Sequence, residues 1–176
     1  ISPMNLLAGE SVSPELLEWI GKHINAGCSF IVNGGTGSGK TTTLSCLLGF
    51  YPNNKRIVTI EKNLELKVPP WKLQAAALEC IPKKNDSSVY VDMRDLVECC
   101  TQMRPDLIVC GEIIDAAAYD AVQAGNTGHQ LATTVHSNSS EKCIERVVSL
   151  TSQAGLIQGK ETLELIAAAI DIIITL

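Results

Sequence analysis

The stretch Phe30-Ile31-Val32-Asn33-Gly34-Gly35-Thr36-Gly37-Ser38-Gly39-Lys40-Thr41 decides which fold this sequence favours. It opens with a short apolar run that is typical of a buried strand, and a helix is expected over 40–49. Between them lies a glycine-rich loop that satisfies the pattern G-x-x-x-x-G-K-[ST]. This pattern binds nucleotide phosphates when a strand precedes it and a helix follows it. We therefore predict a phosphate-binding loop at this point of the chain.

The residue types in this loop suit a polyphosphate. Glycines let backbone N–H groups point inward, and the start of the following helix adds partial positive charge. Lys40 would supply a full charge to the β- and γ-phosphates, and the Thr41 hydroxyl can ligate Mg²⁺. The predicted nucleotide-binding residues are Gly34, Gly35, Thr36, Gly37, Ser38, Gly39, Lys40, Thr41 and Thr42. The loop alone indicates a nucleoside triphosphate and Mg²⁺ and leaves the base open.

The rest of the chain alternates short β-branched runs with helix-like stretches, which predicts an α/β fold with a mostly parallel sheet. Further strands are expected over 56–60, 107–110, 131–135 and 172–176, and helices over 14–27, 92–103, 115–124, 140–153 and 161–169. The segment 69–88 reads as irregular, with one short helix over 74–79. Residues 1–176 are expected to form a single domain, with 1–12 as a linker or domain entry.

Composition limits the partners of the protein. The chain has 176 residues, of which 45% are hydrophobic, and a net charge of -5, which argues against a broad nucleic-acid surface. No apolar run reaches the length of a membrane helix, so we expect no direct membrane insertion. The seven cysteines contain no C-x-x-C pair and read as reduced cytosolic thiols. A start at Ile1 and an end inside an apolar run suggest a domain excised from a longer protein.

Two glutamates follow predicted strands and are candidates for catalysis. Glu112 follows the strand over 107–110, and Glu61 follows the strand over 56–60. Because the carboxyl ends of parallel strands share one edge of a sheet, both could reach a nucleotide bound at the loop. Hydrolysis needs one carboxylate to hold Mg²⁺, often through water, and one to orient the attacking water. The sequence does not assign these two roles, and each residue could also be a solvated strand end.

His136 also follows a predicted strand, at 131–135. It could donate to a γ-phosphate oxygen and report hydrolysis to the rest of the domain, or it could be a structural histidine.

Together these segments resemble the secretion and pilus traffic ATPases of the type II/type IV secretion superfamily, most closely its CpaF-like branch. Residues 34–44 are similar to the Walker A motif of that family, and 56–66 to its Asp box. Residues 103–112 resemble its Walker B motif and 126–138 its His box. All four occur in the family order.

The resemblance implies a RecA-like C-terminal ATPase domain that forms a hexamer and uses ATP with Mg²⁺. In the family such hexamers drive a secretion, pilus or conjugation machine through inner-membrane components, which would place the protein in the cytoplasm at the inner face of the membrane. The resemblance also implies that the active-site residues are Lys40, Thr41, Glu61, Glu112 and His136, with Thr41 and Glu112 at the metal. The accessory candidates are His129, Arg94 and Arg104. Either arginine could reach the phosphate of a neighbouring subunit or pair within the domain.

The sequence departs from the family pattern at two places beside the predicted site. Lys62 stands where the family usually has Asp, and Ile114-Asp115 replaces the usual residues after the Walker B glutamate. The preceding family domain and the final helices are also absent from the sequence. These departures leave open a subunit that binds nucleotide but hydrolyses it poorly, and the loop, which many kinases also carry, leaves open a kinase.

Overall fold

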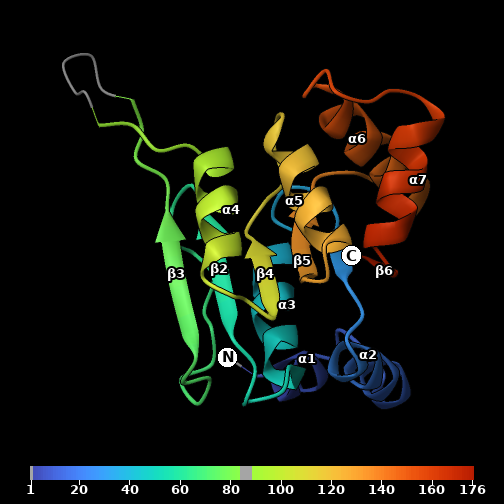
Figure 1. Ribbon diagram of the computed structural model, residues 1–176. Helices are drawn as coiled ribbons and strands as arrows, with labels where there is room; N and C mark the ends of the chain where they lie inside the picture. The colour runs from blue at the N-terminus through green and yellow to red at the C-terminus, as the bar shows by residue number, and fades with distance from the viewer. Residues whose placement is uncertain (1, 84–88) are drawn as a thin grey trace.

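Six parallel strands form one sheet in the computed structural model, which describes residues 2–83 and 89–176. The strand order is β3-β2-β4-β5-β1-β6, and every neighbouring pair is parallel. The strands are β1 (Phe30–Asn33), β2 (Ile57–Glu61), β3 (Ala75–Glu79), β4 (Leu107–Cys110), β5 (Gln130–Val135) and β6 (Ile172–Thr175). The strands and the helices around them give the predicted α/β class (Figure 1).

Helices cover both faces of this sheet. On one face lie α1 (Met4–Ala8), α2 (Pro14–Ala26), α3 (Lys40–Leu47) and the short 3₁₀ helix η1 (Leu48–Phe50). On the other face lie α4 (Met93–Gln102), α5 (Ala117–Asn126), α6 (Ser140–Ser152) and α7 (Lys160–Ala169). This arrangement explains why the central strands are mostly apolar and why β4 is apolar throughout, because both sides of each of these strands are buried.

Strand β4 illustrates how the pleat divides the core. Leu107 and Val109 pack toward α2 and α3, whereas Ile108 and Cys110 pack toward α4 and α5. All four are at most 1% exposed. Burying four such side chains stabilises the centre of the sheet by roughly 1.5–3 kcal/mol for each large aliphatic residue, so the edge that carries the site is held by a rigid strand.

The prediction of a short helix over 74–79 is wrong, because this segment is the edge strand β3. Three consecutive alanines favour a helix locally. In the structure Ala75 lies opposite Ile57 and Glu79 opposite Glu61, so the segment extends the sheet instead. Tertiary pairing with β2 outweighs the local propensity. The last part of the predicted irregular segment, 84–88, lies outside the described residues.

The first residues of the chain pack against the domain. Helix α1 contacts α3, and Leu6, Leu7 and Val12 contact the core cluster beneath α2 and α3. Ser13 caps the amino end of helix α2, where its side chain accepts a hydrogen bond from the Leu16 amide at 3.2 Å. The segment predicted as a linker or entry therefore covers part of the core.

Candidate functional site at the carboxyl edge of the sheet

The carboxyl ends of the parallel strands bring the predicted site residues together. The loop after β1, Glu61 at the end of β2, Glu112 after β4 and His136 after β5 all lie at this edge. They surround a cavity of about 580 Å³. The predicted residues that line it are Gly37, Gly39, Lys40, Thr41, Thr42, Glu61, Glu112 and His136.

The loop itself needs glycine at specific positions. Gly37 and Gly39 have φ of 76° and 91°, a left-handed conformation that other residues seldom adopt. At Gly34 a Cβ would come within 2.5 Å of the Ser38 hydroxyl oxygen. In contrast, space for a Cβ at Gly35, Gly37 and Gly39 is open. The glycines thus allow the loop its left-handed turns, and they leave the space beside Gly35, Gly37 and Gly39 free of other atoms.

Lys40, the first residue of α3, turns back over this loop. Its Nζ donates to the Gly35 carbonyl at 2.7 Å and lies 3.2 Å from His136 Nδ1. Lys40 is only 6% exposed, and this burial lowers the pKa of its ammonium group, while the charge of Glu112 opposes part of the effect. The cation therefore sits in a partly desolvated position where an anion would be favourable.

His136 bridges Lys40 and Glu112. Its Nε2 lies 3.4 Å from Glu112 Oε1, while its Nδ1 faces Lys40. An ammonium group can only donate, so Nδ1 accepts and the proton of a neutral ring is on Nε2, toward Glu112. The three side chains form one polar chain across the cavity, and a phosphate would compete with His136 for Lys40.

Backbone and side-chain hydrogen bonds hold the two loops that carry His136 and Glu112. Ser137 Oγ donates to Asn33 Oδ1 at 2.6 Å, which ties the loop after β5 to the end of β1. Thr134 Oγ1 donates to the Gly111 carbonyl at 2.7 Å, which ties the loop after β4 to β5. Both of these predicted site residues therefore lie on loops that hydrogen bonds hold in place.

Glu61 differs from Glu112 in its surroundings. It is 4% exposed, and its Oε2 accepts hydrogen bonds from the amides of Glu65 and Leu66, each at 2.9 Å. Two amide donors hold this carboxylate, and no cationic side chain among the described residues pairs with it. A Cβ on Gly111 would lie 2.8 Å from Glu61 Cγ, so the close approach of the two strand ends depends on glycine there.

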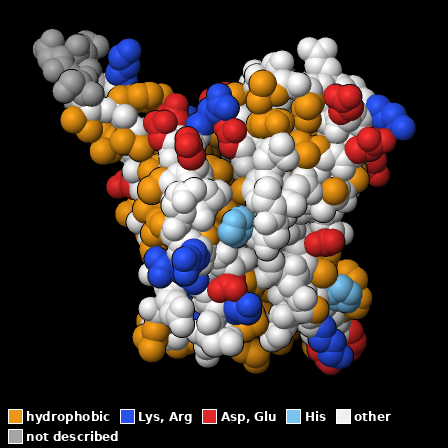
Figure 2. Space-filling model, viewed as in Figure 1, with side chains coloured by type: hydrophobic (Ala, Val, Ile, Leu, Met, Phe, Trp, Pro, Cys, Tyr) orange, Lys and Arg blue, Asp and Glu red, His pale blue; other side chains and the backbone are white. Residues whose placement is uncertain are grey.

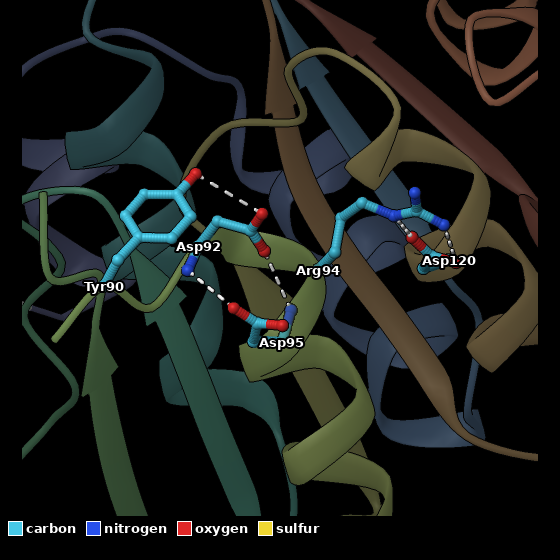
Figure 3. A network of polar contacts seen from close by, with 5 residues as sticks. All are labelled: Tyr90, Asp92, Arg94, Asp95 and Asp120. Atoms are coloured by element: carbon cyan, nitrogen blue, oxygen red, sulfur yellow. Dashed lines mark hydrogen bonds and ion pairs between the residues drawn. The ribbon is translucent and has the colours of Figure 1, made fainter. Parts of the chain in front are cut away.

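The accessory candidates do not line this cavity. His129 precedes β5, at the opposite edge of the sheet, and its Nδ1 lies 2.9 Å from the Pro105 carbonyl. Arg104 is exposed before β4, also at that opposite edge. Arg94 on α4 pairs with Asp120 on α5, with Nη2 3.2 Å from Oδ1 (Figure 3). For Arg94 the structure therefore shows an ion pair within the domain.

Several cavity residues were not singled out as site residues from the sequence. Asn63, Met93, Gly111 and Thr134 line the cavity, as do Lys62 and Ile114, the two departures from the family pattern. Thr134 lies two residues before His136, and in a strand such residues point to the same face. This spacing could therefore have predicted that Thr134 lies beside His136. Met93 enters from the start of α4, far away in the sequence, and no local pattern points to it.

The cavity suits a magnesium nucleotide in the chemistry of its groups. The glycine loop leaves space for phosphate oxygens, and within the described residues no side chain caps the amino end of α3. Backbone N–H groups at such an end attract anions. Thr41 and Glu112 offer the oxygen ligands that Mg²⁺ prefers.

An all-parallel sheet with a glycine loop between β1 and α3, and two acids at the same edge, defines a RecA-like P-loop domain of the nucleoside triphosphatase class. The chain belongs to the family described as type II/IV secretion system protein, which it matches over residues 9–175.

Curated relatives agree with this family. A putative conjugal transfer protein of Mycobacterium tuberculosis is 35% identical over 152 residues, covering 86% of this chain and 43% of the relative. The type IV secretion system protein VirB11 of Bartonella quintana is 30% identical over 173 residues, covering 96% of this chain and 48% of the relative. The chain thus spans less than half the length of these relatives.

Solved structures show the same fold. The VirB11 ATPase of the Brucella suis type IV secretion system, in complex with sulphate, superposes with a TM-score of 0.81 at 23% identity, covering 98% of this chain and 49% of that one. The pilus retraction motor PilT with bound ADP gives a TM-score of 0.69 at 22% identity, with coverage of 93% and 45%.

Proposed function

We propose that this domain hydrolyses ATP with Mg²⁺ to power a secretion, pilus-assembly or conjugation machine. The observation that carries the proposal is the convergence of Lys40, Glu61, Glu112 and His136 on one cavity beside an open glycine loop. The family and the names of its relatives, a conjugal transfer protein, VirB11 and PilT, support ATPase activity.

In this proposal each residue has a role that its position allows. The loop amides and Lys40 hold the phosphates, and Lys40 gives up its contact with His136 when it does so. Thr41 and Glu112 would hold Mg²⁺, which when bound would supply charge neutralisation at the phosphates. Glu61, fixed by two amides, orients the attacking water. His136 contacts the terminal phosphate and senses its loss.

The setting of the whole protein is part of the same proposal. We infer a hexamer of the CpaF-like branch, in the cytoplasm, attached to the inner face of the cell membrane through partner proteins. No helix within residues 2–83 and 89–176 combines the length and the apolar character that a membrane crossing requires. On the face drawn in Figure 2, Lys and Arg side chains lie among Asp and Glu side chains. This mixed charge argues against direct binding of nucleic acid on that face.

Phosphate release by the purified full-length protein tests the proposal. Wild type should release phosphate only with Mg²⁺, Lys40→Ala should fall to background, and Glu112→Gln should bind ATP without turnover. Equal release by wild type and Lys40→Ala would contradict it. Light scattering on the same material measures the subunit number, for which six is expected.

A subunit that binds nucleotide but hydrolyses it poorly is the second candidate. It is favoured by the placement of Lys62 and Ile114 in the cavity wall, where the family pattern has other residues. ATP binding without turnover by wild type would select it. Nothing in the described cavity favours a kinase, and transfer to a panel of acceptors would reveal one.

A further inference from the structure

Lys62 occupies a defined place at the edge of the sheet. The ladder between β2 and β3 runs as far as Glu61, whose carbonyl accepts the Cys80 amide at 2.9 Å. Lys62 is the next residue, the first beyond the ladder. The Glu61 carboxylate then accepts the amides of Glu65 and Leu66, which closes the loop that begins at Lys62. The backbone of Lys62 is therefore fixed from both sides.

Lys62 is an exposed residue in the wall of the candidate nucleotide cavity. Lys62 lines the same cavity as Lys40, Glu112 and His136. Within the described part of the chain its ammonium group enters no ion pair or hydrogen bond. An exposed lysine in such a wall is available to a ligand that carries negative charge.

The formal charge of the cavity lining also indicates a role for Lys62. Its charged lining residues are Lys40, Lys62, Glu61, Glu65 and Glu112, a formal charge of -1. An aspartate in place of Lys62 would change this to -3, so the lysine makes the lining less negative and adds one cation that could contact a bound anion. The described lining contains no arginine. Arg94 pairs with Asp120 outside the cavity, and Arg104 lies at the opposite edge of the sheet. Lys62 is thus the second cation that this chain offers to a bound nucleotide.

We propose that Lys62 contacts the terminal phosphate of ATP and so gives the site its preference for a triphosphate over a diphosphate. This inference rests on the proposed function of the cavity. Lys40 rises from the start of α3 and holds the phosphate chain on one side, while Lys62 reaches it from the end of β2. A cation at the terminal phosphate stabilises the charge that develops during transfer.

Calorimetric titration of the full-length protein tests the role of Lys62. The ligands are Mg-ADP and a Mg-ATP analogue with an imido bridge between the β- and γ-phosphates. Lys62→Gln should raise the Kd of the analogue by about tenfold and leave the Kd of ADP within about twofold, because only the analogue has the terminal phosphate. Lys62→Arg, which keeps the charge, should stay within about threefold of wild type for both ligands.

Lys67→Gln is the matched control, since Lys67 is an exposed lysine five residues further along that does not line the cavity. It should leave both Kd values unchanged. If Lys62→Gln weakens ADP and the analogue equally, or changes neither while Lys40→Ala abolishes binding, Lys62 has no role at the terminal phosphate and the proposed function stands. If wild type binds neither nucleotide, both proposals fail. Retained ADP binding shows that the Lys62→Gln variant is folded.

Discussion

At the residue scale, Gly111 sets how closely the ends of β2 and β4 approach. A methyl group at this position would lie 2.8 Å from Glu61 Cγ, so the Glu61 side chain would have to move from its two amide donors. We expect Gly111→Ala to lower ATP hydrolysis by about 10²-fold, as for removal of one oriented catalytic group, with nucleotide affinity within about threefold. Steady-state kinetics and titration measure the two quantities.

The double variant Gly111→Ala with Glu61→Gln separates this cause from general damage. If the glycine acts by placing Glu61, the alanine should add little once the carboxylate is gone. Independent, multiplying losses in rate would show that Gly111 acts in another way.

Individual residues also show which parts of the site can be predicted from the sequence and which cannot. Glu61, Glu112 and His136 could be placed at one edge because strand order does not matter when all strands are parallel. The contact between Lys40 and His136, 96 positions apart, depends on β1 and β5 being neighbours, and no local pattern reveals that pairing. His129 shares the same motif as His136 but lies at the other edge, because six strand residues separate the two ends of β5.

At the element scale, the start of α4 depends on Asp92. The Asp92 side chain accepts the Asp95 amide and the Asp95 side chain accepts the Asp92 amide, each at 3.0 Å, so the two residues form a capping box (Figure 3). Asp92→Ala should cost about 1 kcal/mol, whereas Asp92→Asn, which can still cap, should cost less. Denaturant unfolding compares the variants, and a loss of equal size in both would contradict the capping argument.

Lys72 joins the segment before β3 to the end of η1. Its Nζ donates to the carbonyls of Gly49 and Tyr51 and to Asn53 Oδ1, and Lys72 is 5% exposed. Replacing it by Met leaves carbonyl groups without their donor, and we expect a loss of about 1–3 kcal/mol in the free energy of unfolding.

This loss should depend on pH because burial lowers the pKa of Lys72 below its ordinary value of 10.5. Between the two pKa values the unfolded chain binds more protons than the folded one, so wild-type stability rises with pH relative to Lys72→Met. The stability difference should therefore grow as the pH is raised toward 10.5. Urea unfolding of both proteins from neutral to alkaline pH measures it, and a constant difference would contradict the expectation.

The strands that the sequence predicted well are the apolar central ones and also the edge strand β6, whose run of three isoleucines is a strand signal by itself. The strands expected over 56–60, 107–110, 131–135 and 172–176 are confirmed to within one or two residues. Strand β3 was missed because its three alanines carry no strand signal and its alternate residues stay exposed. Helix α1, with five residues and no buried side chain of its own, has too weak a pattern to be predicted.

At the scale of the whole molecule, the cavity joins elements from most of the chain. The loop before α3, the ends of β2 and β4, the start of α4 and the end of β5 all contribute to it. A ligand that contacts all of them binds the folded state only, since the unfolded chain does not bring these segments together. Binding should therefore stabilise the entire domain.

Thermal unfolding tests this coupling. A Mg-ATP analogue at about 100 times its Kd adds about 2.7 kcal/mol, and a domain of this size gains about 2–4 °C in Tm per kcal/mol. We expect a rise of about 5–11 °C for wild type, and a smaller rise with chelator present because the Mg²⁺ proposed to bind at Thr41 and Glu112 is then removed. Lys40→Ala should show no rise, since the loop then loses its only lysine. A rise of the same size in Lys40→Ala would mean that the nucleotide binds away from the glycine loop.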